Sequence, residues 1–435
     1  MKRLIYKQLI DWKMSPERKP LVVYGARQVG KTYILKRFGE AEFDDMLYVN
    51  CYKNAQMVTL FNGDADVKRL AIGLSAYANK KIVPGKTLVF LDEIQEIPSV
   101  ISSLKYFCED MPELHVVVAG SLLGVMNMVG QSFPVGKVNI LRLRPMSFEE
   151  FLIASGEEML VELMQRNDWQ MIDVFSPKLT DYLRQYYYVG GMPEAVAHFI
   201  NNRDLLRVRT IQKDILTAYE ADIAKHTGAE TQRVRMVWNS VPAQLARENK
   251  KFIYGAIKKG ARAKDYELAI QWLVDAGLLY KVERVRDPKL PLKFYADSNA
   301  FKLYMLDIGL LGAMVDTSAA QVIIGDSVFT EYKGAFTENY VLQQIKSLSD
   351  MPIYYYSKDN SQQEVDFILQ LPDRVLPIEV KAETNVKSKS LSTFVNCDFK
   401  AYSLRAARFS MKPFQNQGWM ENVPLYSVAG YIRSL

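Results

Sequence analysis

The sequence predicts an α/β protein whose first part is a parallel sheet with helices on both faces. Over the first 150 residues, short apolar runs typical of β-strands alternate with helical stretches; the runs are PLVVYG, DDMLYVNC, KTLVFLDE, HVVVAGS and KVNILRLRP. Strands that alternate with helices pair in parallel, because each helix carries the chain back across a face of the sheet. A glycine-rich loop after the first run and a second group of strand patterns near the C-terminus support the same fold class.

Changes of pattern divide the chain into four expected domains. The parallel-sheet core covers 1–150, and a helical lid or linker covers 151–228. Helices followed by a β-hairpin, with LLYKVERV and PLKFYAD as its strands, outline a winged helix over 229–315. A helix and the short strands IYYYSK, EVDFILQL and LPIEVKA predict a small, separate α/β domain over 316–435.

The clearest helix of the third domain is AKDYELAIQWLVDAG. Its apolar residues Ala269, Trp272, Leu273 and Ala276 recur at the spacing of one helix face. Gly277 follows as a helix stop before the first hairpin strand. This helix therefore leads directly into the expected wing.

Length and composition favour a folded protein outside the membrane. With 435 residues, 49% of them hydrophobic and 24% charged, the chain can bury about two to four separate cores. No apolar run is long enough to span a bilayer or to act as a signal peptide, so we expect a cytoplasmic protein without membrane contact. Three scattered cysteines and three histidines disfavour disulfides and zinc sites. The net charge of +6 permits nucleic-acid contact without requiring it.

The glycine-rich loop after the first strand matches the phosphate-binding pattern G-x-x-x-x-G-K-[ST]. The motif consists of Gly25, Ala26, Arg27, Gln28, Val29, Gly30, Lys31 and Thr32. Its glycines let backbone N–H groups surround phosphates at a helix N-terminus, Lys31 supplies charge to the β and γ phosphates, and the Thr32 hydroxyl can bind Mg²⁺. The strand before it and the helix after it are the required context, so we expect ATP as cofactor, with Mg²⁺.

An acidic pair ends the strand TLVFLDE about sixty residues later. We assign Asp92 to the Mg²⁺ ion and Glu93 to the base that activates water. Asn50 and Ser121 end neighbouring strands, where ligand-facing groups of a parallel sheet gather, and they are candidates to orient Glu93 and to sense the γ-phosphate. A solvated acid pair and ordinary helix-cap residues are the alternatives.

Phosphoryl transfer commonly uses an additional cation. Arg142 and Arg144 of LRLRP are candidates to act on the ATP of a neighbouring subunit. Surface or inter-domain charges are the more ordinary role for both arginines.

A second site is predicted in EVDFILQL-PDRV-LPIEVK, which we interpret as a hairpin. By the period of two, one face carries Val365, Phe367, Leu369, Leu371, Ile378 and Val380. The opposite face then carries Asp366, Glu379 and Lys381. If the turn centres on Pro372 and Asp373, Asp366 lies opposite Glu379; an odd-length loop would shift that register by one residue.

Two opposed carboxylates can share a divalent ion, Mg²⁺ or Mn²⁺, through oxygen ligands. Glu338 on the preceding helix would add a third carboxylate, and Lys381 could position the attacking water. This outlines hydrolytic phosphodiester chemistry. An exposed strand face with an incidental E-x-K is the alternative.

The motifs GARQVGKT, FLDEIQEIP, AGSLLG, RPMSFEEFL, VGGMPEAV and FKLYMLDIGLL resemble, over nearly the full length, a bacterial and archaeal family. Its members join an AAA-type ATPase to a C-terminal domain of otherwise unknown function. The resemblance implies an AAA-like nucleotide module, a winged helix, and a restriction-endonuclease-like C-terminal fold similar to PD-(D/E)XK nucleases and archaeal Holliday-junction resolvases.

Carried onto this chain, that nuclease pattern falls on Glu338, Asp366, Glu379 and Lys381. One departure is VGKV, in which Lys137 stands where many relatives have arginine. Lysine lacks the bidentate fork of arginine, which weakens the case for an arginine finger at this position.

The main functional hypothesis is Mg²⁺-dependent ATP hydrolysis coupled to DNA binding or processing. Lys258, Lys259 and Lys264 of the expected winged helix suit contact with a phosphate backbone. The alternative is an ATP-driven switch whose nuclease-like domain holds DNA or a protein partner without cutting, alone or as a homo-oligomer. A metabolite kinase shares the phosphate-binding loop but leaves the later domains without a role.

Overall fold

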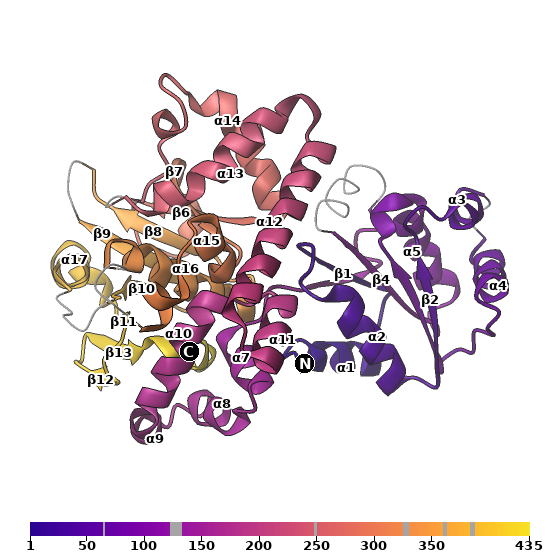
Figure 1. Cartoon of the computed structure of the whole chain (residues 1–435), viewed down its shortest axis with the longest axis horizontal. Helices are drawn as coiled ribbons and strands as arrows, with labels where there is room; N and C mark the ends of the chain where they lie inside the picture. The colour runs from indigo at the N-terminus through magenta and orange to yellow at the C-terminus, as the bar shows by residue number, and fades with distance from the viewer. Residues whose placement is uncertain (64–65, 122–132, 248–249, 325–329, 360–362, 383–387) are drawn as a thin grey trace. The chain divides into compact units, whose positions relative to one another are not determined.

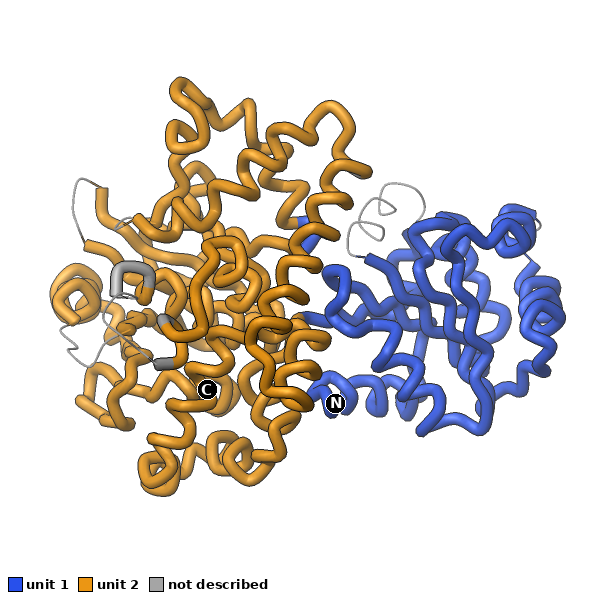
Figure 2. The backbone as a smooth tube through the Cα atoms, viewed as in Figure 1, with its two compact units in different colours: residues 1–144, 275–277 blue, residues 145–274, 278–435 orange. Residues whose placement is uncertain are grey.

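The structure is a computed structural model of residues 1–435, and it forms two compact units (Figures 1 and 2). It describes every residue except 64–65, 122–132, 248–249, 325–329, 360–362 and 383–387. Unit 1 contains Met1–Arg144 with Asp275–Gly277, and unit 2 contains Pro145–Val274 with Leu278–Leu435. Each unit has its own β-sheet, which confirms the mixed α/β class.

The sheet of unit 1 has five parallel strands in the order β2-β3-β4-β1-β5. They are β1 (Leu21–Gly25), β2 (Asp45–Asn50), β3 (Thr87–Asp92), β4 (His115–Ser121) and β5 (Asn139–Arg142). All five lie in the apolar runs expected to be strands. A parallel strand buried on both faces needs continuous apolar sequence, and every residue of β3 is buried.

Helices cover both faces of this sheet (Figure 1). The helices are α1 (Tyr6–Met14), α2 (Lys31–Glu42), α3 (Ala55–Phe61), α4 (Val67–Ala78) and α5 (Ser99–Asp110). On one face, Val89 shares an apolar cluster with Leu70 of α4 and Leu104 of α5. On the other face, α2 passes so close that a Cβ on Gly39 would lie 3.2 Å from the Leu88 side chain.

His115 at the start of β4 gives unit 1 an acid-sensitive position. Its side chain is 6% exposed, and its ring packs edge-on against Trp12 and Phe43. Burial lowers the pKa of His115 to about 4, against about 6.5 in an unfolded chain. Between these values the unfolded state binds a proton that the folded state does not, so stability is lost as the pH falls.

The substitution His115→Leu is expected to remove this acid sensitivity. The unfolding free energy of the variant relative to the original protein should rise by roughly 3 kcal/mol between about pH 7 and about pH 4. Urea unfolding at several pH values measures this difference. A difference that stays constant with pH would contradict the assignment.

Unit 2 is built from helices around a larger sheet. Its helices are α7 (Phe148–Ala154), α8 (Glu158–Gln165), α9 (Trp169–Val174), α10 (Ser176–Val189), α11 (Pro193–Asn202), α12 (Leu205–His226), α13 (Thr231–Leu245), α14 (Ala263–Asp275), α15 (Ile308–Met314), α16 (Thr330–Leu348), α17 (Lys389–Thr393) and α18 (Val428–Arg433). The mainly helical pattern expected after residue 150 corresponds to α7 through α12. Among the described residues, the structure contains no helix long and apolar enough to cross a membrane.

The sheet of unit 2 has eight strands in the order β12-β13-β11-β10-β9-β8-β6-β7. They are β6 (Leu279–Val285), β7 (Ala296–Met305), β8 (Ile353–Ser357), β9 (Glu364–Gln370), β10 (Val375–Val380), β11 (Ala406–Ser410), β12 (Gln415–Asn416) and β13 (Met420–Pro424). The β6-β7 hairpin, expected to be a separate wing, joins this sheet because β6 pairs in parallel with β8. One sheet thus runs across the boundary drawn between residues 315 and 316.

The second hairpin strand lies later than expected. Most of PLKFYAD forms a 3-10 turn over Leu292–Tyr295, and β7 begins at Ala296. The buried part of β7 is its second half, AFKLYM, so the apolar side chains that fix the strand follow the segment first assigned to it.

Candidate functional site

The Gly25–Thr32 loop joins β1 to α2 in unit 1. A Cβ at Gly25 would lie 2.1 Å from the Leu143 carbonyl oxygen, so the residue must be glycine for β5 to pair beside it. Gly30 caps α2 with φ 93°, and Gln28 has φ 63°. This left-handed geometry turns the chain sharply into the helix, whose first N–H groups have no intrahelical partner and are suited to bind an anion.

Lys31 is positioned inside this loop. Its Nζ donates to the carbonyl oxygens of Gly25 at 3.1 Å and Ala26 at 2.9 Å. The side chain is 8% exposed, and burial lowers the pKa of Lys31 to about 8 although Glu93 and Asp92 favour its charge. The backbone thus holds a buried cation at the place where a triphosphate would need one.

Asp92 lies directly beside the start of α2. Its Oδ2 accepts hydrogen bonds from Thr32 Oγ1 at 2.7 Å and from Tyr48 Oη at 3.3 Å. Burial raises the pKa of Asp92, and the Thr32 hydrogen bond opposes that change. A hydroxyl and a carboxylate in contact offer the hard oxygen ligands that Mg²⁺ prefers, so these residues fit the ion.

Glu93 follows in a left-handed conformation with φ 55°, which is uncommon for a residue other than glycine. Its Oε2 accepts a hydrogen bond from Gln95 Nε2, and Gln95 Oε1 accepts from the Ser121 backbone N–H at 3.3 Å. Gln95 therefore connects the expected base to the end of β4. Gln95 was not among the residues predicted from the sequence, although its place two residues after the acidic pair is a usable signal.

Asn50 and Ser121 both lie at the carboxyl edge of the sheet. Asn50 is opposite Asp92 in the β2-β3 ladder, but it is exposed and its Oδ1 accepts from the Tyr52 N–H at 2.8 Å. Ser121 is opposite Gly25 in the β1-β4 ladder. The strand register thus brings Ser121 to the phosphate-binding loop, whereas the Asn50 side chain caps a local turn.

The basic residues near β5 have partners within unit 1. Arg142 lies over the Tyr24 ring, 6.0 Å from its centroid, and the Arg144 carbonyl accepts from Arg3 at 2.7 Å. Lys137 pairs with Glu109 at 2.8 Å. Both arginines are partly buried, and their action on the ATP of a neighbouring subunit stays a prediction.

In unit 2, the turn of the β9-β10 hairpin centres on Pro372 and Asp373. The Leu371 N–H donates to the Arg374 carbonyl at 2.9 Å, and Ile378 lies opposite Phe367. Continuing that register by one residue sets Glu379 opposite Asp366, whose Oδ2 accepts from the Val380 N–H at 2.7 Å.

The strict alternation expected along β9 is wrong at Asp366 and Phe367. The β8-β9 register shifts between Tyr354, opposite Ile368, and Tyr356, opposite Val365. An extra β9 residue at this point is a bulge, so Val365 packs in the same apolar cluster as Ile368 rather than with Phe367. The bulge changes the direction of the side chains beside Asp366.

Glu338 of α16 is buried among cations. Lys250 Nζ contacts its Oε1 at 2.5 Å, while Tyr304 Oη donates to its Oε2 at 3.0 Å and Lys302 Nζ lies 3.8 Å away. Burial favours the neutral acid, but the two lysines outweigh it and lower the pKa of Glu338. Burial and the Glu338 charge raise the pKa of the neighbouring Asp366.

These contacts do not fit a divalent ion at the second site. Both oxygens of Glu338 are occupied, and Lys381 pairs with Glu379 Oε1 at 2.8 Å. Over the described residues, no group of three or more His, Cys, Asp or Glu is arranged to hold a metal. Glu379 Oε2 stays buried without a hydrogen-bond partner. The Mg²⁺ or Mn²⁺ expected at this site is therefore unsupported, because lysine ammonium groups pair with Glu338 and Glu379.

Comparison with known proteins identifies the N-terminal domain. Residues 17–152 match an AAA domain, and residues 333–426 match a domain of unknown function, DUF4143. The chain therefore contains an AAA domain, followed towards its C-terminus by a domain of unknown function. Residues 180–321 match a second domain of unknown function, DUF8612. The AAA match and the geometry of the Gly25–Thr32 loop make this protein an ATP-binding P-loop ATPase.

Individual relatives of this AAA-type ATPase are distant. An uncharacterized protein of Methanocaldococcus jannaschii is 22% identical over 395 residues, covering 87% of this chain and 78% of the relative. The Aeropyrum pernix Orc1 protein, solved in complex with DNA, is 12% identical to this chain, with a TM-score of 0.24. The match covers 72% of this chain and 90% of the Orc1 chain. Cdc6p of Pyrobaculum aerophilum is 10% identical, with the same TM-score and coverages of 72% and 92%. Similarity at this level gives no indication of a shared partner.

Proposed function

We propose that this protein couples Mg²⁺-dependent ATP hydrolysis in unit 1 to DNA binding by unit 2. The contact between Thr32 and Asp92 at 2.7 Å carries the first half of the proposal, because it sets two metal-binding oxygens beside Lys31. When bound, Mg²⁺ neutralises charge on the phosphates. Lys31 holds the phosphates, Glu93 takes a proton from the attacking water, and Gln95 keeps Glu93 in position.

The charge distribution of unit 2 supports DNA as the partner. Residues 381–435 contain eight Lys and Arg against three Asp and Glu. Lys258 and Lys259 are exposed shortly before α14, and Lys264 is exposed in its first turn. Such an excess of cations favours binding to a phosphate backbone and makes it sensitive to salt. The alternative to DNA is a protein partner or a second copy of the chain.

Within this function, the C-terminal domain acts by binding without cutting. The observation that favours this choice is the pairing of Glu338 with Lys250, which occupies the acid that the nuclease pattern requires. The orphan oxygen Glu379 Oε2 is the observation in favour of cleavage, since a buried carboxylate oxygen needs a partner.

An ATPase assay run beside a DNA-cleavage assay tests the proposal. With linear, branched and single-stranded DNA, in Mg²⁺ and in Mn²⁺, we expect ATP turnover to respond to DNA while every substrate stays intact. Metal-dependent cleavage that is lost in Asp366→Ala but kept in Lys31→Ala would replace binding by nuclease activity. ATP turnover that responds to no DNA would contradict the coupling.

A further inference from the structure

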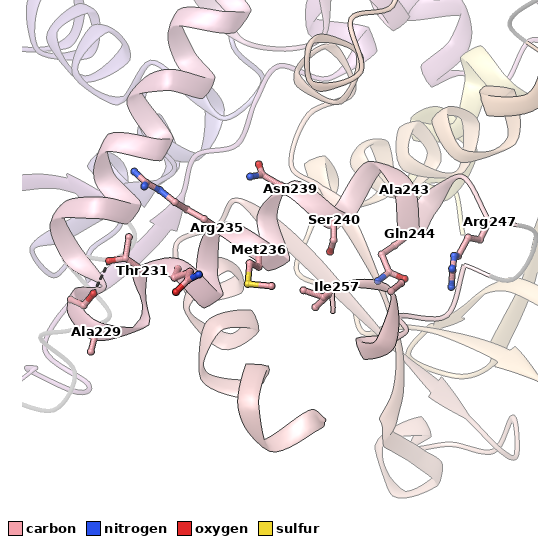
Figure 3. Close-up of a pocket in the computed structure, with 13 residues that line it drawn as sticks. Ala229, Thr231, Arg235, Met236, Asn239, Ser240, Ala243, Gln244, Arg247 and Ile257 are labelled. Atoms are coloured by element: carbon pink, nitrogen blue, oxygen red, sulfur yellow. Dashed lines mark hydrogen bonds between the residues drawn. The ribbon is translucent and has the colours of Figure 1, made fainter. Parts of the chain in front are cut away.

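A groove runs along one face of α13 in unit 2 (Figure 3). Its volume is about 820 Å³, and it is bordered by the turn at 228–231 and by Ala256 and Ile257. Arg235 and Arg247 stand toward opposite ends of the helix, with Asn239 between them (Figure 3). The groove thus combines an apolar floor with polar side chains along its length.

The charge in this groove is uniformly positive. No acidic residue lines it among the described residues, and neither Arg235 nor Arg247 has a side-chain hydrogen bond or ion pair there. Arg233 on the same helix differs, because it pairs with Glu230 at 2.6 Å. Both guanidinium groups are exposed beside the groove, where they favour an anionic ligand that can bond to them directly.

The spacing of the arginines points to an extended anion. Arg235 lies in α13 and Arg247 two residues beyond its last residue, Leu245, so the helical part between them alone spans about 15 Å. That length exceeds a single phosphate group and matches about four nucleotide steps of one strand at about 3.4 Å each. Beyond the groove lining, Lys258, Lys259, Arg262 and Lys264 are exposed, so the positive surface continues past the groove.

We propose that the groove along α13 binds the sugar-phosphate backbone of a nucleic acid. The inference rests on the proposed function and adds the place of contact, which is α13 rather than α14, the helix that precedes the hairpin. Arg235 and Arg247 bind phosphates, and Asn239 donates to the strand between them. Met236 and Ile257 form the apolar part of the lining against which sugars pack.

Fluorescence anisotropy with a labelled DNA duplex and the matching single strand tests the assignment. The double variant Arg235→Glu, Arg247→Glu should weaken binding at least about tenfold and lower the slope of log affinity against log salt by about two. The matched control Arg233→Glu, on the same helix outside the groove lining, should change affinity by less than about twofold. Basal ATP hydrolysis should be unchanged in both.

Each outcome decides the matter. If the full chain binds DNA and the double variant binds equally well, the groove is not the site and the proposed function stands. If the full chain binds neither DNA, both fail. If the double variant loses binding to polyglutamate while its DNA binding is unchanged, the groove takes an acidic peptide instead. Should charge reversal unfold the chain, as circular dichroism would reveal, Arg235→Gln with Arg247→Gln replaces it with the same expected direction.

Discussion

The substitution Glu93→Gln is expected to lower ATP turnover by about 10²–10⁴-fold while ATP binding persists. Glutamine keeps the size of the side chain and its contact with Gln95, but it cannot accept a proton from the attacking water. Since Lys31, Thr32 and Asp92 are untouched, nucleotide affinity should change little. Steady-state ATPase assays together with nucleotide titration separate the two effects.

Glu96→Gln is the matched control for this prediction. Glu96 lies in the 3-10 turn Ile94–Glu96, directly after Glu93, and carries the same charge. Its variant should keep ATP turnover close to that of the original protein. If Glu93→Gln hydrolyses ATP normally, Glu93 is not the base, and another group must activate the water.

The second large effect is expected at Lys302, whose side chain is fully buried. Its Nζ pairs with Glu364 and lies 3.8 Å from Glu338. Lys302→Met keeps the volume but leaves buried carboxylates short of a counter-charge. We expect the free energy of unfolding to fall by about 3–5 kcal/mol. Urea unfolding followed by tryptophan fluorescence reports on unit 2, which holds four of the five tryptophans.

Two further variants test whether the loss of stability comes from the unpaired buried charge. Lys281→Met on β6 removes a half-exposed pair with Glu283, which should cost less than about 1 kcal/mol. Adding Glu338→Gln to Lys302→Met should recover part of the loss, because the unpaired charge disappears with it. A Lys302→Met variant as stable as the original protein would mean that the cluster does not hold unit 2 together.

The sheet of unit 1 was predictable because its information is local. Each buried parallel strand is a continuous apolar run, and the phosphate-binding loop is a contiguous motif. The contact between Thr32 and Asp92 was predictable for the same reason. Thr32 follows β1 and Asp92 ends β3, and parallel strands end at the same edge of their sheet.

The second site was less accessible to sequence because its contacts are distant. Lys250 is 88 residues from Glu338, and Lys302 is 62 residues from Glu364. Nothing in the hairpin sequence indicates these partners. The bulge at Asp366 also breaks the period of two, which any prediction from alternation assumes. Pairing of β6 with β8 is likewise a tertiary event that no local pattern records.

The most direct test of nucleotide binding by the Gly25–Thr32 loop is calorimetry. A slowly hydrolysed ATP analogue is titrated into the protein with and without Mg²⁺. We expect one nucleotide site per chain, binding that weakens at least about tenfold in Lys31→Ala, and loss of the Mg²⁺ contribution to binding in Asp92→Asn. Absence of binding by the original protein, or equal affinity in Lys31→Ala, would contradict this expectation.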